Sequence, residues 1–245
     1  MTEKVLRERQ CSQGEKSTTR QVYRKVDHSM RAPFITFEGS EGCGKSTQVA
    51  RLIEHLKNEG VDLFVTREPG GTAIGESIRQ LLQFAPEAHS MKPETEVLLF
   101  AASRAQLVRE MITPAVARGC WVVADRFADS TTVYQGAARG LGIDAVAMLN
   151  QFAVADCRPD ATFYIAVDVE IAQRRMVARG STKADRMEQQ PLEFYQRVER
   201  AYRDLAAVEP KRIIVIDGAA NPDDVEQQIW TNIVERFGKL LPSRR

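Results

Sequence analysis

Long apolar runs, clustered metal ligands and a strong net charge are all missing from this 245-residue chain. No apolar stretch approaches the roughly 18 residues that a membrane-spanning helix needs. Residues 1–30 also lack the apolar core of a secretory signal. A net charge of +1 creates no overall field that would attract a nucleic acid or a membrane surface. The sequence therefore predicts neither a membrane nor a nucleic acid as partner.

Cysteine and histidine are scarce. The four cysteines and three histidines show no spacing typical of a metal site. Unpaired cysteines indicate a reducing compartment, so we expect a cytoplasmic protein. With 43% hydrophobic residues, a chain of this length can bury the core of a single α/β domain.

The first 30 residues differ in composition from the rest of the chain. They carry seven Lys and Arg against four Asp and Glu, with little apolar periodicity. We expect 1–30 to be a disordered N-terminal extension, or a segment upstream of a natural start at Met30. The domain is predicted to span 31–238, and 239–245 to form a C-terminal tail.

The most informative stretch is a glycine-rich loop that matches G-x-x-x-x-G-K-[ST]. An apolar run at 34–37 predicts a strand before it, and apolar residues at 49, 52, 53 and 56 predict a helix after it. Strand, glycine loop and helix together predict a phosphate-binding loop for ATP. Lys45 would reach the β- and γ-phosphates, and Ser46 would bind Mg²⁺. The predicted phosphate-binding residues are Gly39, Ser40, Glu41, Gly42, Cys43, Gly44, Lys45, Ser46 and Thr47.

Strand and helix patterns alternate from residue 31 onward. Further strands are predicted at 63–66, 121–124, 162–167 and 213–216. Helices are predicted near 73–83, 94–117, 144–154, 169–178, 192–207 and 223–237. Fully apolar strands separated by helices are typical of an α/β fold with a parallel sheet covered on both faces.

Several separated motifs accompany the glycine loop. They are F-E-G-x-E-G-x-G-K-S, T-R-E-P-G-G-T, L-F-A-A-S-R-A-Q-L, D-R-F with S-T-x-x-Y-Q-G, R-P-D, and A-R-G followed by D-R-M-E. The N-K-x-D motif that a GTPase uses to read its base is absent. Over residues 31–238 the chain resembles a thymidylate kinase.

This resemblance implies a P-loop nucleoside-monophosphate kinase fold: a five-stranded parallel sheet with helices on both faces and a small mobile lid at about 179–190. It implies transfer of the γ-phosphoryl group of ATP to dTMP, giving dTDP and ADP in dTTP biosynthesis. Mg²⁺ is the implied cofactor, and a homodimer is the implied assembly.

Two arginines follow predicted strands. Arg67 comes after the second strand and Arg126 after the third, so both lie at the sheet edge where open α/β sheets bind ligands. A guanidinium group binds phosphate through two parallel hydrogen bonds and keeps its charge. The resemblance assigns both arginines to the acceptor phosphate; the alternative is that they are solvated surface residues.

The helix predicted after Pro93 offers a base site. Phe100 and Arg104 lie four residues apart and therefore on one face. The resemblance implies that Phe100 stacks on thymine and that Arg104 donates to a thymine carbonyl, although Phe100 alone would fit an apolar core. Tyr134 is implied to crowd the sugar 2′-carbon, unless it is a rim residue with no discriminating role. The expected polar rim comprises Gln106, Ser130, Thr131 and Gln135.

Two acidic residues leave alternatives open. Asp125 ends a strand and would either hold Mg²⁺, directly or through water, or orient Arg126 by an ion pair. Glu41 is implied to face the deoxyribose 3′-hydroxyl or a nearby water molecule. The alternative is that Glu41 faces solvent.

Basic residues are concentrated between Arg174 and Glu188, with Gly180 as the expected hinge. One branch of thymidylate kinases carries an arginine in the phosphate loop, where this chain has Gly42; the other supplies that charge from the lid. The A-R-G and D-R-M-E pattern resembles the lid-arginine branch, which is common in bacteria. Arg186 is thus the first candidate to stabilise the transferring phosphoryl group and Arg179 the second. Arg174 is expected to stack on adenine.

Phosphoryl transfer depends on alignment and charge neutralisation, so no general base is expected. The predicted catalytic residues are Lys45, Arg126, Arg186 and Arg179. Two alternatives remain: a kinase of the same fold that acts on dUMP, dCMP or a deoxynucleoside, and a regulatory protein that binds ATP without transferring its phosphate.

Overall fold

The computed structural model describes residues 31–178 and 190–242. Five strands alternate with helices: β1 (Phe34–Glu38), β2 (Leu63–Arg67), β3 (Trp121–Asp125), β4 (Ala161–Ala166) and β5 (Ile213–Asp217). They form one sheet in the order β2-β3-β1-β4-β5, and every pairing is parallel. All five predicted strands are confirmed to within one residue at each end.

The helices of the described residues are α1 (Lys45–Asn58), α2 (Ala73–Gln83), α3 (Pro93–Leu107), α4 (Thr113–Ala117), α5 (Ala128–Thr131), α6 (Ile143–Val154), α7 (Val169–Ala178), α8 (Leu192–Val208) and α9 (Pro222–Phe237). Two 3-10 turns, η1 (Pro86–Ser90) and η4 (Gly238–Leu240), and two π-helical segments, η2 (Val108–Ile112) and η3 (Thr132–Ala138), complete them. Within these ranges no helix combines the length and the apolar character that crossing a membrane requires.

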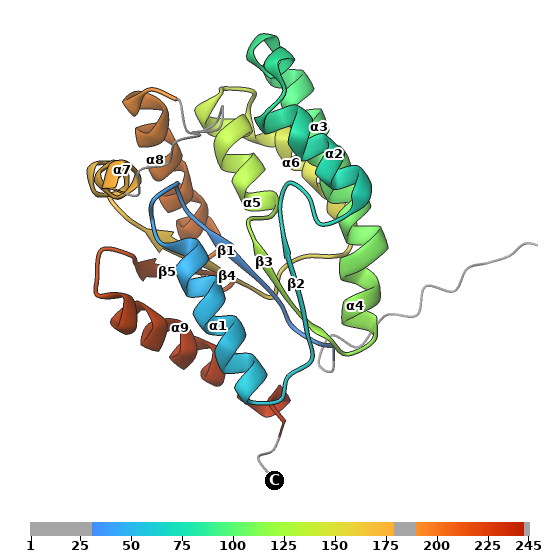
Figure 1. Cartoon of the computed structure of the whole chain (residues 1–245), viewed down its shortest axis with the longest axis vertical. Coiled ribbons are helices and arrows are strands. Elements are labelled where there is room, and N and C mark those ends of the chain that lie inside the picture. The colour runs from blue at the N-terminus through green and yellow to red at the C-terminus, as the bar shows by residue number, and fades with distance from the viewer. Residues whose placement is uncertain (1–30, 179–189, 243–245) are drawn as a thin grey trace, which may run out of the picture. The chain divides into compact units, whose positions relative to one another are not determined.

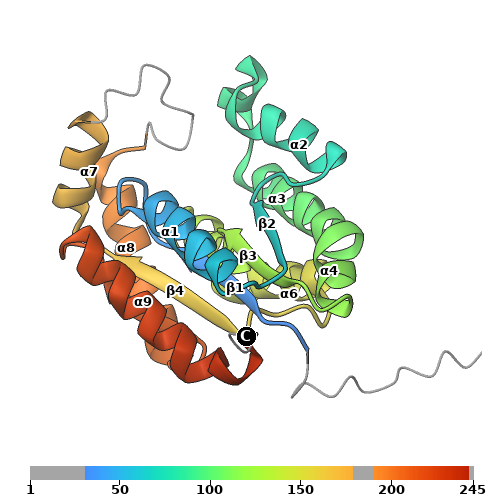
Figure 2. The same ribbon diagram turned by 60° about the horizontal axis from the view of Figure 1, so that its bottom comes forward.

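Helices α1 and α9 lie side by side against one face of the sheet (Figures 1 and 2). Leu52 of α1 and Ile229 of α9 are buried there in one cluster with Ile35 and Phe37 of β1. Because side chains alternate along a strand, Phe34 faces the opposite side and packs with the segment from α3 to α4. The core therefore has two layers, one on each side of the sheet.

The second face is also covered by α8, which packs on β4 and β5. Val198 and Tyr202 of α8 are buried with Tyr164 of β4 and Ile213 of β5. Tyr134 of η3 belongs to the same cluster. Helices on both faces of a parallel sheet confirm the predicted fold class.

One helical stretch was missed. The predicted helical stretch at 94–117 is confirmed, and its middle part, η2, is π-helical between α3 and α4. The helical stretch from Ala128 to Ala138, formed by α5 and η3, was not predicted. Consecutive β-branched residues at 131–133 and the glycine at 136 lower its helix propensity, and a π-helical segment has no 3.6-residue apolar period.

The carboxyl ends of β1, β2 and β3 meet at one edge of the sheet. Phe37 and Arg67 each align with Asp125 in the strand register. The residues that follow each strand are therefore neighbours: the glycine loop, Glu68 and Arg126. This is the edge at which open parallel sheets bind ligands.

Candidate active site

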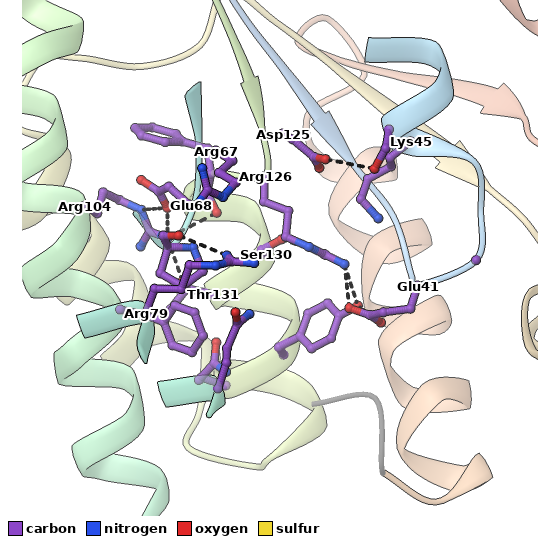
Figure 3. Close-up of a pocket in the computed structure, with 18 of the residues that line it drawn as sticks. Glu41, Lys45, Arg67, Glu68, Arg79, Arg104, Asp125, Arg126, Ser130 and Thr131 are labelled. Carbon is purple, nitrogen blue, oxygen red and sulfur yellow. Dashed lines mark hydrogen bonds and ion pairs between the residues drawn. The ribbon is translucent and has the colours of Figure 1, made fainter. Parts of the chain in front are cut away.

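A cavity of about 500 Å³ lies at this edge. Its wall is formed by the glycine loop, the ends of β2 and β3, and residues of α2, α3, α5 and η3 (Figure 3). The charged lining residues are Lys45, Arg67, Arg79, Arg104 and Arg126 against Glu41, Glu68 and Asp125. This excess of positive charge favours an anionic ligand.

Two of the three glycines in the glycine loop differ in their surroundings. Gly44 precedes α1 at φ +99°, and a Cβ atom there would meet nothing within 4 Å. Gly42 has φ +78°, and a Cβ atom there would lie 2.3 Å from the carbonyl oxygen of Ala172 in α7. The space beside Gly44 is open, whereas position 42 accepts a side chain only if the backbone shifts.

Lys45 is buried within the loop. Its Nζ donates to the carbonyl oxygens of Gly39 and Ser40, at 2.9 Å each. This ammonium group and the N-terminus of α1 concentrate positive charge where phosphates would bind. Of the predicted loop residues, Glu41, Gly42, Gly44, Lys45, Ser46 and Thr47 line the cavity, whereas Gly39, Ser40 and Cys43 do not.

Arg126 directly follows β3 and points toward the glycine loop (Figure 3). Its Nη2 donates to Glu41 Oε1 at 2.6 Å, its Nη1 donates to Ser130 Oγ at 3.1 Å, and its guanidinium lies 5.2 Å from the centre of the Tyr134 ring. The backbone of Arg126 has φ +70°, a region that costs a non-glycine residue energy and is found at functional sites.

Glu41 does not face solvent. Its carboxylate accepts hydrogen bonds from Arg126 and from the Tyr134 hydroxyl, the latter at 2.8 Å. Burial favours a higher pKa, but the charges of Arg126 and Lys45 and the Tyr134 hydrogen bond outweigh it and lower the pKa of Glu41. A charged carboxylate therefore lies beside the position expected for the acceptor.

Arg104 of α3 is 1% exposed and is held by a dense set of acceptors. Glu68 Oε2 accepts from its Nε at 2.8 Å and from its Nη2 at 2.5 Å. Nη2 donates to Thr131 Oγ1 at 2.8 Å (Figure 3). Nη1 donates to Asn150 Oδ1 at 2.7 Å. A guanidinium group has five N–H donors, and Nη1 retains one N–H beyond its bond to Asn150.

Glu68, the partner of Arg104, was not predicted as a site residue. It follows β2, lines the cavity, and its Oε1 is buried without a hydrogen-bond partner among the described residues. Burial raises the pKa of the Glu68 carboxyl to about 7, although the charge and hydrogen bonds of Arg104 act in the opposite direction. The position of Arg104 thus depends on a carboxyl group that can titrate near neutral pH.

Ser130 connects the site to a second buried acid, Glu38 at the end of β1. Its Oγ donates to Glu38 Oε2 at 2.6 Å, and the hydroxyl of Tyr202 donates to the same oxygen at 2.8 Å. Phe127 N donates to Glu38 Oε1 at 2.8 Å. Burial, with the nearby charge of Asp129, raises the pKa of Glu38. Glu38 therefore fixes the start of the segment that carries Arg126 and Ser130.

Asp125 lies opposite the start of α1. Its Oδ2 accepts a hydrogen bond from Ser46 Oγ at 3.3 Å. Among the described residues, Arg126 forms its ion pair with Glu41, not with Asp125. The structure therefore does not support the alternative that Asp125 orients Arg126.

The predicted base-site residues meet at the cavity wall. Phe100 is partly exposed and lines the cavity with Arg104, Thr131, Tyr134 and Gln135. Phe100 is therefore not an ordinary core residue. Gln106 does not line the cavity; its Nε2 donates to Glu110 Oε2 of η2 at 2.6 Å.

Arg67 lines the cavity as predicted, and its Nη2 donates to Glu76 of α2 at 2.9 Å. Sequence reasoning missed Arg79 and Gln83, which also line the cavity from α2. Arg79 Nη1 donates to the carbonyl oxygen of Pro69 at 3.1 Å. Their four-residue spacing puts Arg79 and Gln83 on one helix face, which is the signal that could have identified them.

The predicted lid residues are only partly described. Arg174 is exposed on α7, where its Nε donates to Glu170 O at 3.4 Å, and it does not line the cavity. Arg179 and Arg186 lie outside the described residues, as does the N-terminal extension 1–30.

Known proteins resemble this chain over most of its length. The family model described as thymidylate kinase matches residues 37–229. The chain is 50% identical over 189 residues to a thymidylate kinase of Caldanaerobacter subterraneus subsp. tengcongensis, a match that covers 77% of this chain and 88% of that protein. The chain belongs to the thymidylate kinase family. It is therefore a nucleoside-monophosphate kinase, and members of this family phosphorylate dTMP to dTDP with ATP in the synthesis of dTTP.

Two further comparisons agree with this membership. A thymidylate kinase of Kosmotoga olearia is 46% identical over 207 residues, with 84% of this chain and 98% of that protein covered. The crystal structure of thymidylate kinase from Ehrlichia chaffeensis shares the fold, with a TM-score of 0.66, 34% identity, and coverage of 82% of this chain and 98% of that one. The family and fold predicted from the motifs are thus confirmed. Phosphoryl transfer in this family generally requires a divalent metal ion.

Proposed function

We propose that this chain transfers the γ-phosphoryl group of ATP to dTMP through the residues that line the cavity. The observation that carries the proposal is that one cavity is lined both by the glycine loop with Lys45 and by Arg126, Phe100 and Arg104. The first set is suited to a polyphosphate. The second offers a guanidinium group that can bind phosphate, an aromatic ring face and a buried hydrogen-bond donor. Donor and acceptor can therefore lie side by side, as direct transfer requires.

Arg126 is the proposed ligand of the acceptor phosphate. In the protein alone it pairs with Glu41, so a phosphate dianion would compete with Glu41 for the guanidinium group. Arg67 and Arg79 line the same cavity from the end of β2 and from α2. We propose that they add further positive charge around the two phosphate groups.

The base and the sugar are proposed to contact α3 and η3. Phe100 would stack on the pyrimidine ring, and Arg104 would donate its remaining N–H to a carbonyl oxygen. Tyr134 is fixed by its hydrogen bond to Glu41 and by its contact with Arg126. A ring held in this way can exclude a 2′-hydroxyl sterically, while Glu41 would accept from the 3′-hydroxyl. Ser130, Thr131 and Gln135 complete the proposed acceptor site.

Ser46 and Asp125 are the proposed ligands of Mg²⁺. A hydroxyl and a carboxylate oxygen 3.3 Å apart, together with substrate phosphate oxygens, are the ligands that Mg²⁺ prefers. Among the described residues no group of three or more His, Cys, Asp and Glu could hold a metal ion, so phosphate and water oxygens would complete the coordination. When bound, the ion would offset part of the phosphate charge.

The proposed transfer needs no covalent intermediate on the protein. A phosphate oxygen of dTMP attacks the γ-phosphorus, a P–O bond forms, the bond to the β,γ-bridging oxygen breaks, and ADP leaves. Because a phosphate monoester has a second pKa of about 6, the acceptor is already a dianion near neutral pH. Lys45 and Arg126 would neutralise charge on the transferring group.

We propose that the remaining positive charge comes from Arg186, with Arg179 as the second candidate. Supporting this, an arginine at position 42 would clash with Ala172 O, as any side chain there would. Helix α7, which contacts the loop at Ala172, ends at Ala178, about 9 Å farther along the helix axis. The described part of α7 therefore ends near the phosphate loop. Arg174 remains a proposed adenine contact.

A homodimer and a cytoplasmic location are further proposals. Leu98 of α3 and Met148 and Phe152 of α6 are 54%, 71% and 77% exposed, and α3 packs against α6. Large apolar side chains exposed on adjoining helices favour a protein interface, and we propose that a second copy of the chain covers them. The described cysteines are free thiols, which suits the reducing cytoplasm.

An acceptor panel tests the proposed function. Purified protein with Mg·ATP is offered dTMP, dUMP, dCMP, UMP, AMP and thymidine, and ADP formation is followed. We expect strong turnover on dTMP, weaker turnover on dUMP and little on UMP. Preference for another acceptor would identify a different kinase, and ATP binding without acceptor-dependent ADP would indicate a regulatory protein.

A further inference from the structure

Two buried hydrogen bonds connect α3 to the α5–η3 segment on either side of Phe100. At one, Arg104 Nη2 donates to Thr131 Oγ1 at 2.8 Å. At the other, Gln135 Nε2 donates to Glu96 Oε1, also at 2.8 Å. Glu96, Phe100 and Arg104 are spaced four residues apart and share one face of α3. The second contact contains an acidic residue that none of the predicted roles uses.

Glu96 determines which way the Gln135 amide faces. Its side chain is 1% exposed and is paired with Arg139, whose Nε lies 2.6 Å from Oε1. A carboxylate in such a pair only accepts hydrogen bonds, so the amide must present its NH₂ group to it. The opposite orientation would place two oxygen lone pairs together in a buried site, which is costly. The amide orientation thus follows from charge.

The Gln135 oxygen is consequently directed away from Glu96. Gln135 lines the cavity although it is only 1% exposed. No side-chain or backbone group of the described residues donates to its Oε1. The cavity wall near Phe100 therefore offers a fixed acceptor from Gln135 beside a fixed donor group from Arg104.

We propose that Glu96 is a positioning residue for base selection: it holds the Gln135 amide so that its oxygen accepts an N–H of the acceptor base. This inference rests on the proposed function, in which Gln135 belongs to the acceptor site, and adds to it the residue that fixes the orientation of the Gln135 amide. Thymine and uracil carry a hydrogen at ring N3. Cytosine has a lone pair there and would leave the Gln135 oxygen facing another acceptor.

The expected selectivity follows from the cost of an unmatched buried acceptor. One such mismatch corresponds to roughly a 10- to 100-fold change in relative rate. Arg104 discriminates independently, because it donates to a carbonyl oxygen and not to the amino group of cytosine. Loss of Glu96 should thus reduce the preference for dTMP over dCMP without abolishing it.

The test compares Glu96→Gln with Glu94→Gln, a matched substitution at an exposed position of the same helix. For each variant, and for the unmodified protein, kcat/KM is measured with dTMP and with dCMP at saturating Mg·ATP. A glutamine at 96 carries no charge and holds Arg139 less tightly than the carboxylate does. It can therefore turn the NH₂ end of its amide toward Gln135, and the amide of Gln135 loses its fixed orientation. We expect the dTMP:dCMP ratio to fall at least tenfold in Glu96→Gln and to stay within twofold in Glu94→Gln.

A second variant separates positioning from general damage. Gln135→Ala removes the proposed acceptor and should lower the same ratio to a similar extent. Adding Glu96→Gln to Gln135→Ala should then cause no further loss of selectivity. If Glu96→Gln does not fold, Gln135→Ala alone decides: an unchanged ratio overturns the proposal, because the amide would then not read the base.

The outcomes distinguish this inference from the proposed function. No dTMP-dependent ADP formation by the unmodified protein would refute the function itself. Normal dTMP kinase activity with an unchanged dTMP:dCMP ratio in Glu96→Gln would refute only the role of Glu96. Equal losses with both acceptors would likewise show that Glu96 is structural and does not select the base.

Discussion

Replacing Arg126 tests the proposed acceptor-phosphate site. Two charge-assisted hydrogen bonds to a phosphate contribute about 1.5–3 kcal/mol each, or about 3–6 kcal/mol together. In the protein alone, however, Arg126 already pairs with Glu41, and both side chains are less than 20% exposed. Phosphate binding breaks that contact, which lowers the net contribution of Arg126 to binding by about 1–2 kcal/mol. The net loss in Arg126→Ala is thus about 2–4 kcal/mol, or roughly 30- to 1,000-fold in kcat/KM for dTMP.

The backbone allows a clean comparison of variants at this position. Arg126 has φ +70°, and alanine and lysine both retain the Cβ atom that makes this conformation costly. Backbone strain is therefore the same in Arg126→Ala and Arg126→Lys. Lysine keeps the charge but cannot form two parallel hydrogen bonds, so Arg126→Lys should recover only part of the lost activity.

The assay is steady-state ADP formation with dTMP varied, together with a separate measurement of ATP affinity by equilibrium binding. ATP affinity should stay within about threefold, because Lys45 and the glycine loop make no hydrogen bond to Arg126 except through Glu41. Added guanidinium ion should partly restore the activity of Arg126→Ala. A kcat/KM for dTMP within fivefold of the unmodified protein would refute the assignment.

Three more predictions concern other parts of the molecule. Arg186→Ala should lower kcat on the order of a thousandfold, by analogy with other arginines that stabilise a transferring phosphoryl group, and near-normal turnover would contradict the lid assignment. The raised pKa of Glu68, from 4.5 to about 7, means that the folded state binds a proton more tightly than the unfolded state. The free energy of unfolding should therefore fall as pH rises between these values, by up to about 3 kcal/mol relative to Glu68→Gln. Denaturant titrations of both proteins at pH 5 and pH 8 measure this change. If the unfolding free energies of the two proteins differ by the same amount at both pH values, the pKa of Glu68 is not raised. Phe152→Glu should convert a dimer to a monomer in light scattering, whereas a monomeric parent protein would rule out the interface.

The sheet was predictable because its strands carry an unambiguous pattern. Continuous apolar runs such as 34–37 and 121–124 fit strands buried on both faces. The segment at 128–138 was not predictable in the same way, because β-branched residues and a π-helical geometry remove the periodic signal. Its position over the site became clear only from the fold.

Part of the cavity lining was predictable from motifs whose residue types suit a phosphate or a base. Lys45, Arg126 and Phe100, which these motifs contain, all line the cavity. The buried acids behind them were missed. Glu68 and Glu96 act on neighbouring side chains, and the identity of those partners depends on contacts 36 and 39 residues apart in the sequence.

Such acids do leave one trace in the sequence. Glu96 lies on the same face of α3 as Phe100 and Arg104, and Glu38 ends a fully apolar strand. An acidic residue at a core-facing position requires a partner, because burying an unpaired charge is costly. Sequence reasoning can therefore identify positions of this kind, but their partners come from the tertiary structure.

The most direct test of the central claim is transfer of labelled phosphate. The full-length protein is incubated with Mg·ATP labelled at the γ-phosphate and with dTMP, and the nucleotide products are separated and counted. We predict labelled dTDP in equal amount to ADP, and none of either without dTMP. ATP binding without labelled dTDP, or ADP formation that does not depend on dTMP, would contradict the claim that this cavity joins ATP and dTMP for direct phosphoryl transfer.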